Sequence, residues 1–383
     1  MKIIVAGGDG FCGWPTSLYL SNQGFDVAIV DNLVRREIDE ELNSNSLTPI
    51  APIEERIAKW KELTGKEIQL FIGDLNDYDF LSEVFKTFEP EAFVHFAEQR
   101  SAPYSMIDRE HAVYTQSNNV LGNLNVLYAI KEFNPDCHLI KLGTMGEYGT
   151  PNIDIEEGYL EVEHKGRKET FLYPKSPGSF YHLTKVHDTN NIYFAVRSWG
   201  IRATDLNQGV VYGVNTKETK MDPVLVNRFD YDGIYGTVMN RFIIQTASGL
   251  PMSVYGKGGQ TRGFINIEDT VRCIELAAQN PPERGDFKIY NQMTEQFSVL
   301  ELAEKVNEVA KKYFGLDGKI EHMENPRVEK EEHYFNAVIT KLKDLGLEAH
   351  LLTDEVIKDI MELAIDNADR VKPNNVMNSP SWR

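Results

Sequence analysis

The chain has 383 residues, of which 42% are hydrophobic and 26% are charged, and its formal net charge at pH 7 is −18. This length exceeds what most single hydrophobic cores support and predicts two closely associated domains. The acidic balance argues against a nucleic-acid-binding protein, which needs a basic surface. No apolar run of about 18 residues is uninterrupted, so we expect no membrane span.

Short apolar segments alternate with longer helix-like segments through the first half of the chain. This alternation is typical of βαβ units and predicts an α/β fold with a Rossmann-type doubly wound parallel sheet. The strands are expected at residues 2–7, 27–31, 69–74, 92–97 and 138–143.

Two insertions interrupt this alternation. Residues 35–66 form a connection longer than usual, and the segment IEERIAKWKEL within them predicts a helix. Residues 159–173 alternate around Lys165-Gly166, which predicts a hairpin.

The β/α regularity weakens after about Leu206, where we expect a smaller α/β C-terminal substrate domain. Residues 262–279 predict one more strand and helix that return to the large sheet. The expected division is a dinucleotide-binding Rossmann domain of residues 1–206 and 262–281, and a substrate-binding domain of residues 207–261 and 282–383.

A glycine motif, VAGGDGFCGW, connects the first strand to the next helical segment. Its residues Gly7, Gly10 and Gly13 allow a tight turn and let a pyrophosphate approach the backbone at a helix N-terminus. Asp31 ends the next strand, where an acidic residue binds the adenosine ribose. The motif therefore predicts a dinucleotide site, although a glycine-rich turn without a ligand has the same spacing.

The residues around this motif bear on which dinucleotide binds. Asp31 would repel a 2′-phosphate and therefore favours NAD over NADP. Arg35 and Arg36 leave NADP open as an alternative, because an arginine can bind its 2′-phosphate. Cys12 has no adjacent base that would activate its thiol, so we expect it to pack within the loop.

The cysteines and histidines bear on the redox environment of the protein and on metal binding. Cys12, Cys137 and Cys273 form no CxxC pair, which predicts reduced thiols in a cytoplasmic protein. His182 and His187 do not share one helix face, and we expect no metal.

Tyr181 and Lys185 in the segment YHLTK lie four residues apart and would share one face of a helix. A neighbouring ammonium favours the phenolate and lowers the pKa of a tyrosine. Such a pair can remove a proton from a sugar hydroxyl while a hydride leaves for a nicotinamide. Thr144 supplies a hydroxyl for the same reacting oxygen, although a packed tyrosine beside a solvated lysine is the usual alternative.

Together these motifs resemble the extended short-chain dehydrogenases/reductases that act on nucleotide sugars. Further segments, which run from Gly7 to beyond Arg327, are similar to the family of UDP-sulfoquinovose synthases. They are VDNLVRR, LTPIAPIEERIAKWKELTGK, HFAEQRSAPYSMIDR, GTMGEYGTPNIDIEEGY, FYHLTKVHD, ATDLNQGVVYG, YGKGGQTRG and NPRVEKEEHY.

The resemblance implies a reaction and two sets of ligand-holding residues. UDP-glucose and sulfite would give UDP-sulfoquinovose through NAD-dependent C4 oxidation, loss of water across C5 and C6, addition of sulfite at C6 and reduction at C4. The residues implied for NAD are Gly10, Phe11, Cys12, Asp31, Asn32, Arg35, Asp74, Leu75 and Asn118, with Lys185 and Val211 near its nicotinamide end. The residues implied for the UDP-sugar are Asn207, Gln208, Arg241, Gln260, Arg262 and Arg327.

Single residues in these sets have ordinary readings as well. Each arginine taken alone is explained equally well as one partner of a surface ion pair. A diphosphate bound to an acidic protein, however, needs bidentate cationic groups such as these arginines. Asp74 taken alone reads as a helix N-cap.

The segment GTMGEYG departs from nucleotide-sugar 4,6-dehydratases, which typically carry Asp-Glu directly after the threonine. Met145 and Gly146 stand at those two positions, and Glu147 follows one residue later. Glu147 then either does the acid/base work at C5 and C6 or faces away and caps the backbone. His182 beside the tyrosine is the second candidate for that work, and Arg100 is a candidate cation for sulfite.

Several alternatives stay open at this point. A nucleotide-sugar 4-epimerase or 4,6-dehydratase without sulfur chemistry is the second enzyme reading, and a non-catalytic NAD-sensing protein is a reading from another class. The sulfur arrives either as free sulfite or from a sulfur-donor protein, and the product feeds either lipid or glycan synthesis. The family resemblance also implies a homodimer.

Overall fold

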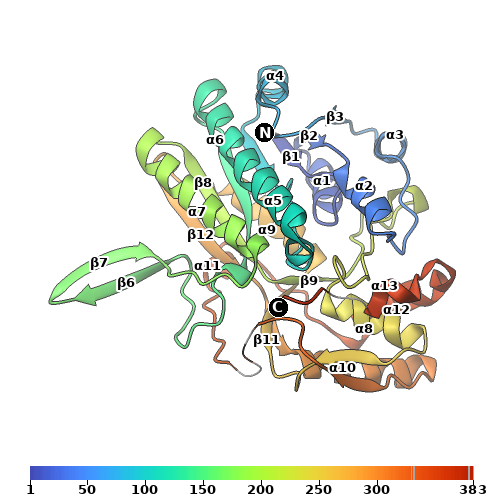
Figure 1. Cartoon of the computed structure of the whole chain (residues 1–383). Coiled ribbons are helices and arrows are strands. Elements are labelled where there is room, and N and C mark those ends of the chain that lie inside the picture. Colours follow the sequence, from blue (N-terminus) through green and yellow to red (C-terminus); the bar gives the residue numbers. More distant parts are fainter. Residues whose placement is uncertain (329, 331–332, 378–379, 383) are drawn as a thin grey trace.

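The computed structural model describes residues 1–328, 330, 333–377 and 380–382. Its largest element is a seven-stranded sheet with the order β12-β8-β5-β4-β1-β2-β3, in which every neighbouring pair is parallel (Figure 1). The five predicted strands all form within this sheet, which confirms the doubly wound α/β expectation. The strands are β1 (Lys2–Ala6), β2 (Asp26–Asp31), β3 (Ile68–Ile72), β4 (Ala92–His95), β5 (His138–Thr144), β8 (Arg202–Gln208) and β12 (Phe287–Gln292).

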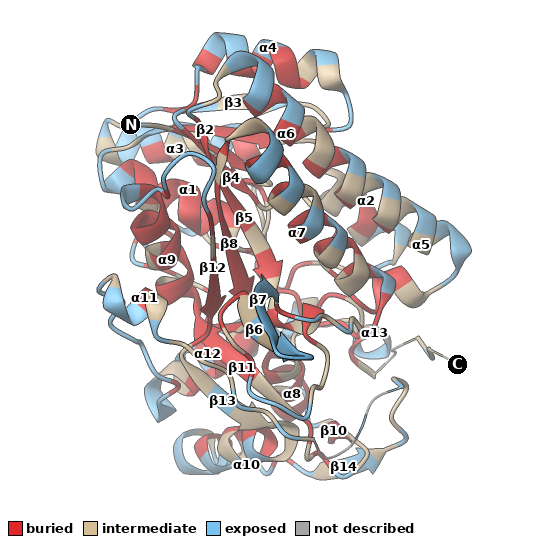
Figure 2. Ribbon diagram, turned by 90° about the vertical axis from the view of Figure 1, so that its left-hand side faces the viewer, coloured by how far each residue is buried: buried red, intermediate tan, exposed pale blue. Residues whose placement is uncertain are grey.

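Helices cover both faces of this sheet, so its central strands are buried (Figure 2). Alternate residues of β1 enter opposite cores: Ile3 and Val5 pack in one, Ile4 and Ala6 in the other. The helices of the first core are α1 (Gly13–Asn22), α3 (Ile53–Thr64), α9 (Ile267–Gln279) and α11 (Lys341–Asp344). The helices of the second core are α4 (Tyr78–Phe88), α6 (Gly122–Phe133) and α7 (Phe180–Trp199), with α5 (Arg109–Gln116) beside α7.

A third core lies beneath the carboxyl ends of the large sheet and belongs to the later part of the chain. Its strands form two small sheets, β13-β11-β9 and β10-β14. These strands are β9 (Val210–Tyr212), β10 (Met252–Tyr255), β11 (Thr261–Asn266), β13 (Glu295–Ser298) and β14 (Ile320–Met323), and the helices are α8 (Val238–Ala247), α10 (Val299–Val309), α12 (Asp354–Asp366) and α13 (Pro373–Met377). The division into two domains at the expected boundaries stays a prediction.

The predicted strand at Arg262 forms as β11, but it joins the small sheet and not the large one. Phe264 pairs with Val210 of β9, and Arg262 pairs with Phe297 of β13. The place beside β8 in the large sheet is taken by β12, whose residues all pair with β8. The helix that follows β11 behaves as expected, because α9 packs against α1.

Both predicted insertions are confirmed. Residues 35–66 contain most of α2 (Val34–Glu41) and the expected helix α3. The hairpin consists of the antiparallel strands β6 (Tyr159–His164) and β7 (Arg167–Leu172), and it projects from the body of the molecule (Figure 1). Lys165 and Gly166 connect the strands with φ values of 51° and 74°, as a tight hairpin turn requires.

Short helical turns complete the fold. They are η1 (Tyr104–Met106), η2 (Ser117–Leu121), η3 (Met145–Glu147), η4 (Pro223–Leu225), η5 (Ala310–Phe314) and η6 (Ala368–Arg370). Within the described residues, we find no helix that combines the length and the apolar character needed to cross a membrane.

Candidate active site

A cavity of about 820 Å³ opens at the carboxyl ends of the parallel strands. Its walls come from the loops after β1, β2, β3, β4 and β5 and from the small sheets of the later part of the chain. Open parallel sheets bind their ligands at this edge. The cavity also contains most of the residues that the sequence singles out.

All the residues predicted for the cofactor line this cavity. They are Gly7, Gly10, Phe11, Cys12, Gly13, Asp31, Asn32, Arg35, Asp74, Leu75, Asn118, Lys185 and Val211. The lining also includes most residues predicted for catalysis and substrate, namely Arg100, Thr144, Tyr181, His182, Gln208, Arg262 and Arg327.

Four predicted residues are not among those that line the cavity. Asn207 donates to the Tyr148 hydroxyl at 2.7 Å, and Arg241 donates to the Tyr255 hydroxyl at 3.0 Å. Gln260 donates to a backbone carbonyl at 3.2 Å. The fourth is Glu147, which is fully buried.

The glycine loop brings the N-terminus of α1 to the cavity. Gly7 has a φ of 84°, which favours glycine, and a Cβ atom on Gly13 would overlap the Gly7 carbonyl. Asp31 accepts hydrogen bonds from the backbone N–H groups of Asp9 and Leu33 at 2.9 and 2.7 Å. Burial raises the pKa of the Cys12 thiol to about 12, so this cysteine is not a nucleophile at neutral pH.

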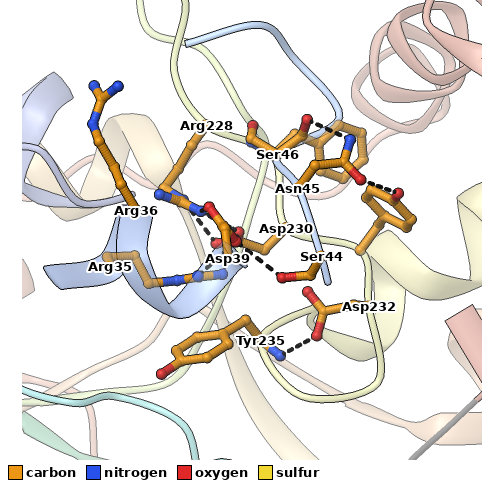
Figure 3. A network of polar contacts seen from close by, with 12 residues as sticks. Arg35, Arg36, Asp39, Ser44, Asn45, Ser46, Arg228, Asp230, Asp232 and Tyr235 are labelled. Carbon is orange, nitrogen blue, oxygen red and sulfur yellow. Dashed lines mark hydrogen bonds and ion pairs between the residues drawn. The ribbon is translucent and has the colours of Figure 1, made fainter. Parts of the chain in front are cut away.

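The two arginines after Asp31 are both engaged by carboxylates. Arg36 donates to both oxygens of Asp9, at 2.6 and 2.9 Å. Arg35 pairs with Asp39 at 2.6 Å and with Asp230 at 3.0 Å, and its guanidinium stacks on the ring of Tyr235. Figure 3 shows Arg36 pointing away from the carboxylates that hold Arg35.

Asp74 is not the N-cap of a helix, although its sequence context alone suggests that role. Asp77 caps α4 by accepting the Phe80 N–H. Asp74 instead accepts hydrogen bonds from the Asn32 amide at 3.1 Å and from the Asn76 backbone at 2.8 Å.

Tyr181 and Lys185 lie on one face of α7 and both line the cavity. The Lys185 ammonium lies 5.8 Å from the centre of the Tyr181 ring. The ammonium donates to the Leu142 carbonyl at 2.6 Å and pairs with Glu98 at 2.6 Å. Glu98 follows the buried strand β4, and sequence reasoning missed it, although a carboxylate directly after an apolar strand was its signal.

Thr144 ends β5 on the wall of the same cavity. Its hydroxyl accepts the Gly146 N–H at 3.2 Å, and its own N–H donates to Glu147 at 3.2 Å. This reciprocal arrangement is a capping box that fixes the short helix η3.

The carboxylate of Glu147 lies in a buried polar cluster beneath η3. It pairs with Lys175 and lies 3.7 Å from the Lys141 ammonium, and the Thr189 hydroxyl donates to it at 3.1 Å. Burial alone would raise the pKa of Glu147, but the two ammonium groups outweigh that effect and lower it to about 2. The placement favours the second of the two readings of Glu147, the one that caps the backbone.

His182 lines the cavity beside η3. Its Nδ1 lies 3.1 Å from the Ser179 hydroxyl, which also accepts the His182 backbone N–H. Burial and the nearby Arg327 and Arg262 lower the pKa of His182 to about 3, so the imidazole is neutral at neutral pH. A Cβ atom on Gly146 would overlap this imidazole.

Arginines line the side of the cavity that the later part of the chain forms. Arg262 lies 3.1 Å from Nε2 of His333, and Arg327 lies over the ring of Trp382, with its guanidinium carbon 5.1 Å from the ring centre. His333 and Trp382 also line the cavity, although sequence reasoning did not single them out. On the other side, Arg100 pairs with Asp230 through Nη2.

Comparisons with known proteins identify the family. The model of the NAD dependent epimerase/dehydratase family matches residues 3–291. A UDP-sulfoquinovose synthase of the chloroplast from Spinacia oleracea is 58% identical over 382 residues, which cover all of this chain and 79% of that protein. A UDP-sulfoquinovose synthase from Sulfolobus acidocaldarius is 42% identical over 386 residues, which cover all of this chain and 98% of that protein.

The chain belongs to the UDP-sulfoquinovose synthases of the NAD dependent epimerase/dehydratase family. As in this family, its cofactor is NAD. The solved structure of UDP-glucose 4-epimerase from Bifidobacterium longum in complex with NAD+ and UDP has the same fold. It superposes with a TM-score of 0.71 over 97% of this chain and 100% of that one, at 20% identity.

Proposed function

We propose that the chain converts UDP-glucose and sulfite to UDP-sulfoquinovose. The sequence of steps is oxidation at C4, loss of water across C5 and C6, addition of sulfite at C6 and reduction at C4. The observation that carries this proposal is the similarity over the whole chain to two UDP-sulfoquinovose synthases. The loop after β5 supports it, because Met145 and Gly146 provide neither carboxylate of a typical 4,6-dehydratase.

The residues of the glycine loop and the strand ends fit NAD. The backbone of the loop at the N-terminus of α1 offers N–H groups to a pyrophosphate, and Asp31 offers its carboxylate to a ribose. Arg35 and Arg36 already bind carboxylates, so neither is a free partner for a 2′-phosphate. Bound there, NAD would supply a hydride acceptor for the oxidation at C4 and, in its reduced form, a hydride donor for the reduction.

Tyr181 and Lys185 do the proton chemistry at C4. The phenolate of Tyr181 accepts the proton of the C4 hydroxyl during oxidation and returns it during reduction. Burial raises the pKa of Tyr181, and the charge of Lys185 offsets part of this rise in favour of the phenolate. The Thr144 hydroxyl lies on the same cavity wall to bind the reacting oxygen.

His182 is the proton shuttle that we propose at C5 and C6. Its imidazole lines the cavity next to Tyr181, where it can accept the acidified C5 proton once C4 is a ketone. Glu147 is paired with two ammonium groups beneath the wall, where it supports the loop.

Cations on the cavity walls suit the anionic ligands. Arg262 and Arg327, with Gln208, are the lining residues that we assign to the UDP-sugar. Asn207, Arg241 and Gln260, which the family resemblance also implies, are buried and are not among the lining residues. Arg100 is the cation that we assign to the incoming sulfite. Asp230 anchors its Nη2, while its Nη1 makes only a long contact of 3.5 Å with the Tyr235 carbonyl.

Incubation of the NAD-loaded protein with UDP-glucose, with and without sulfite, tests this function. We expect a product with the mass of UDP-sulfoquinovose only when sulfite is present, without net formation of NADH. UDP-galactose as the product would support the 4-epimerase, and a stable 4-keto-6-deoxy sugar would support the 4,6-dehydratase. Tight NAD binding without any turnover would support the NAD-sensing protein.

The same reaction with a sulfur-donor protein in place of sulfite tests the source of the sulfur. All three cysteines are free in the structure, which supports the reducing, cytoplasmic environment that we infer.

We also infer a homodimer. Val113 of α5, Leu121 of η2 and Phe180 and Phe194 of α7 are exposed on adjacent helices, which Figure 1 shows side by side on one face. Exposed apolar groups that gather in this way are typical of an interface. Light scattering should give the mass of two chains, and a monomer would contradict this inference.

A further inference from the structure

A buried ion pair lies next to the catalytic tyrosine. The Nζ atom of Lys185 lies 2.6 Å from Oε2 of Glu98 and donates to the Leu142 carbonyl at 2.6 Å. The side chains of Lys185 and Glu98 are only 3% and 1% exposed. One of the three ammonium donors binds the Leu142 carbonyl, whereas Glu98 holds the ammonium by charge, since neither of its oxygens accepts a hydrogen bond from the described residues.

The chemistry proposed above does not use Glu98. A tyrosine and a lysine are sufficient for proton transfer at C4, and a buried carboxylate carries a large desolvation cost unless it is paired. Glu98 nevertheless lines the cavity, in the loop that follows β4. Its position therefore requires a reason beyond packing.

Charged groups from several elements surround this pair. His95 of β4 lies 3.6 Å from Oε1 of Glu98, and Lys141 of β5 donates to the Lys185 carbonyl at 3.1 Å. Asp188 lies in α7 and is fully buried, and Arg100 lies in the loop that carries Glu98. Among the residues that the structure describes, Glu98 is the carboxylate that pairs directly with Lys185.

The carboxylate changes how strongly the lysine acts on the tyrosine. Burial would lower the pKa of Lys185, but the Glu98 carboxylate, together with Tyr181 and Asp188, outweighs this effect, so the pKa is raised. Burial raises the pKa of Tyr181; Lys185 lowers it in part, and Glu98 acts against the lysine. Lys141 and Arg100 also lower the pKa of the tyrosine. Glu98 thus offsets part of the positive charge that Lys185, Lys141 and Arg100 place around the phenol.

We propose that Glu98 is a positioning residue for Lys185 and Tyr181, whose carboxylate fixes the ammonium against β5 and offsets its charge. Tyr181 then keeps the proton that it takes from the C4 hydroxyl while water leaves and sulfite adds. The same proton is available when the C4 ketone is reduced. This inference rests on the proposed function, in which oxidation and reduction at C4 are separated by two other steps.

The variant Glu98→Gln tests the role because it keeps the shape of the side chain and removes its charge. The measurement is the pH dependence of NADH formation when the NAD-loaded protein is mixed with UDP-glucose without sulfite. The fall in rate at low pH reports protonation of the base, Tyr181. We expect this acid limb to move to lower pH by about one unit or more, as is typical for the loss of a close charge.

Glu157→Gln is the matched control, since Glu157 is a buried glutamate that contacts Asn291, Thr340 and Lys341 away from the cavity. Its acid limb should coincide with that of the wild type. An unchanged limb in Glu98→Gln, or a limb at higher pH, would overturn the proposal.

Two further measurements separate this proposal from the function itself. An ultraviolet titration of tyrosine ionisation, taken as the difference between each protein and its Tyr181→Phe counterpart, reports the pKa of Tyr181 without turnover. It should show the same downward shift in Glu98→Gln, and no shift would overturn the proposal even if the chain does not use UDP-glucose. If Glu98→Gln does not fold, Glu98→Asp should give a smaller shift in the same direction, and an unchanged pKa would overturn it.

Discussion

The imidazole of His182 occupies the space in which a side chain at Gly146 would lie. A Cβ atom on Gly146 would overlap Nε2 and Cδ2 of His182, so only glycine permits this packing. The position is one that carries a carboxylate in typical nucleotide-sugar 4,6-dehydratases. In this chain an imidazole from α7, next to Tyr181, occupies that place.

Gly146→Ala should separate the oxidation step from the steps that follow it. The added methyl group forces the His182 imidazole to move, because the three atoms nearest to it all belong to that ring and none belongs to Tyr181 or Lys185. We expect NADH to form on addition of UDP-glucose within about tenfold of the wild-type rate, and sulfonation to fall by ~10²-fold or more, as for the loss of a positioned base. Rapid mixing and product mass spectra measure the two rates.

A double-mutant cycle controls this prediction. If Gly146 serves only to admit His182, then Gly146→Ala should add nothing to the loss caused by His182→Ala. Additive losses of sulfonation would show that the glycine has a separate role.

His182→Gln and Glu147→Gln should differ in their effect on the C5 hydrogen. In deuterated water, exchange at C5 of the bound sugar reports the proton shuttle directly. We expect His182→Gln to abolish exchange while NADH still forms, because the amide cannot transfer a proton at neutral pH. Correctly folded Glu147→Gln should retain exchange, and the opposite pattern would return the shuttle to Glu147.

Glu147 should also set part of the acid stability of the protein. Its pKa is lowered to about 2 from an ordinary value of 4.5, so its contribution is complete above pH 4.5 and is lost as the pH falls towards 2. Glu147→Gln should lower the free energy of unfolding at pH 7 by about 3 kcal/mol, because buried ammonium groups lose their partner. Denaturant unfolding should show this difference shrinking below pH 4.5; a constant difference would contradict the assignment.

Local patterns in the sequence predicted most of the fold and much of the site. The alternation of apolar segments gave the strands of the large sheet, and the spacing of Tyr181 and Lys185 placed both on the cavity, since each pattern acts within a few residues. The Glu147 side chain points into a buried cluster because its carboxylate pairs with Lys141 and Lys175, which come from other segments of the chain. A lysine in the middle of the apolar strand HLIKL was the available signal that a buried carboxylate lies nearby.

Pairings between distant segments could not be predicted from local patterns in the sequence. A strand after Arg262 could be predicted, but its partners β9 and β13 are chosen by packing in the third core. The cluster around Asp230 likewise joins the insertion after β2 to a loop almost 200 residues later, as Arg35 and Asp230 show (Figure 3).

Asp230→Asn should weaken NAD retention. The carboxylate of Asp230 binds Arg35, Arg100 and Arg228, two of which line the cavity. Neutralising it releases Arg100 from its carboxylate and leaves Arg35 and Arg228 to share Asp39, so we expect less NAD to co-purify and faster NAD dissociation. Quantification of NAD released on denaturation measures the first effect.

Asp232→Asn is the matched control for this prediction. Asp232 lies in the same loop and accepts the backbone N–H groups of Ile234 and Tyr235, which an asparagine oxygen can also do. It should retain NAD as the wild type does. Equal NAD content in both variants would contradict a role for the Asp230 cluster.

Trp382 should report the binding of the UDP-sugar. Its ring lies beside Arg327 on the cavity wall, and its indole N–H is buried without a hydrogen-bond partner among the described residues. A buried indole N–H normally has a partner, and a diphosphate or sugar oxygen would provide one. We expect UDP or UDP-glucose to change the tryptophan emission of the wild type and to leave that of Trp382→Phe unchanged.

The other three tryptophans provide the control for this measurement. Trp14 and Trp60 are buried in the first core, and Trp199 lies at the end of α7 beside Lys131. Trp199→Phe should therefore retain the full UDP-induced change.

Because Trp382→Phe also removes the indole donor, its affinity for UDP should fall by about fivefold or more, the loss expected for one net hydrogen bond. If the emission change persisted in Trp382→Phe, the uridine diphosphate would have to lie elsewhere in the cavity, away from Arg327.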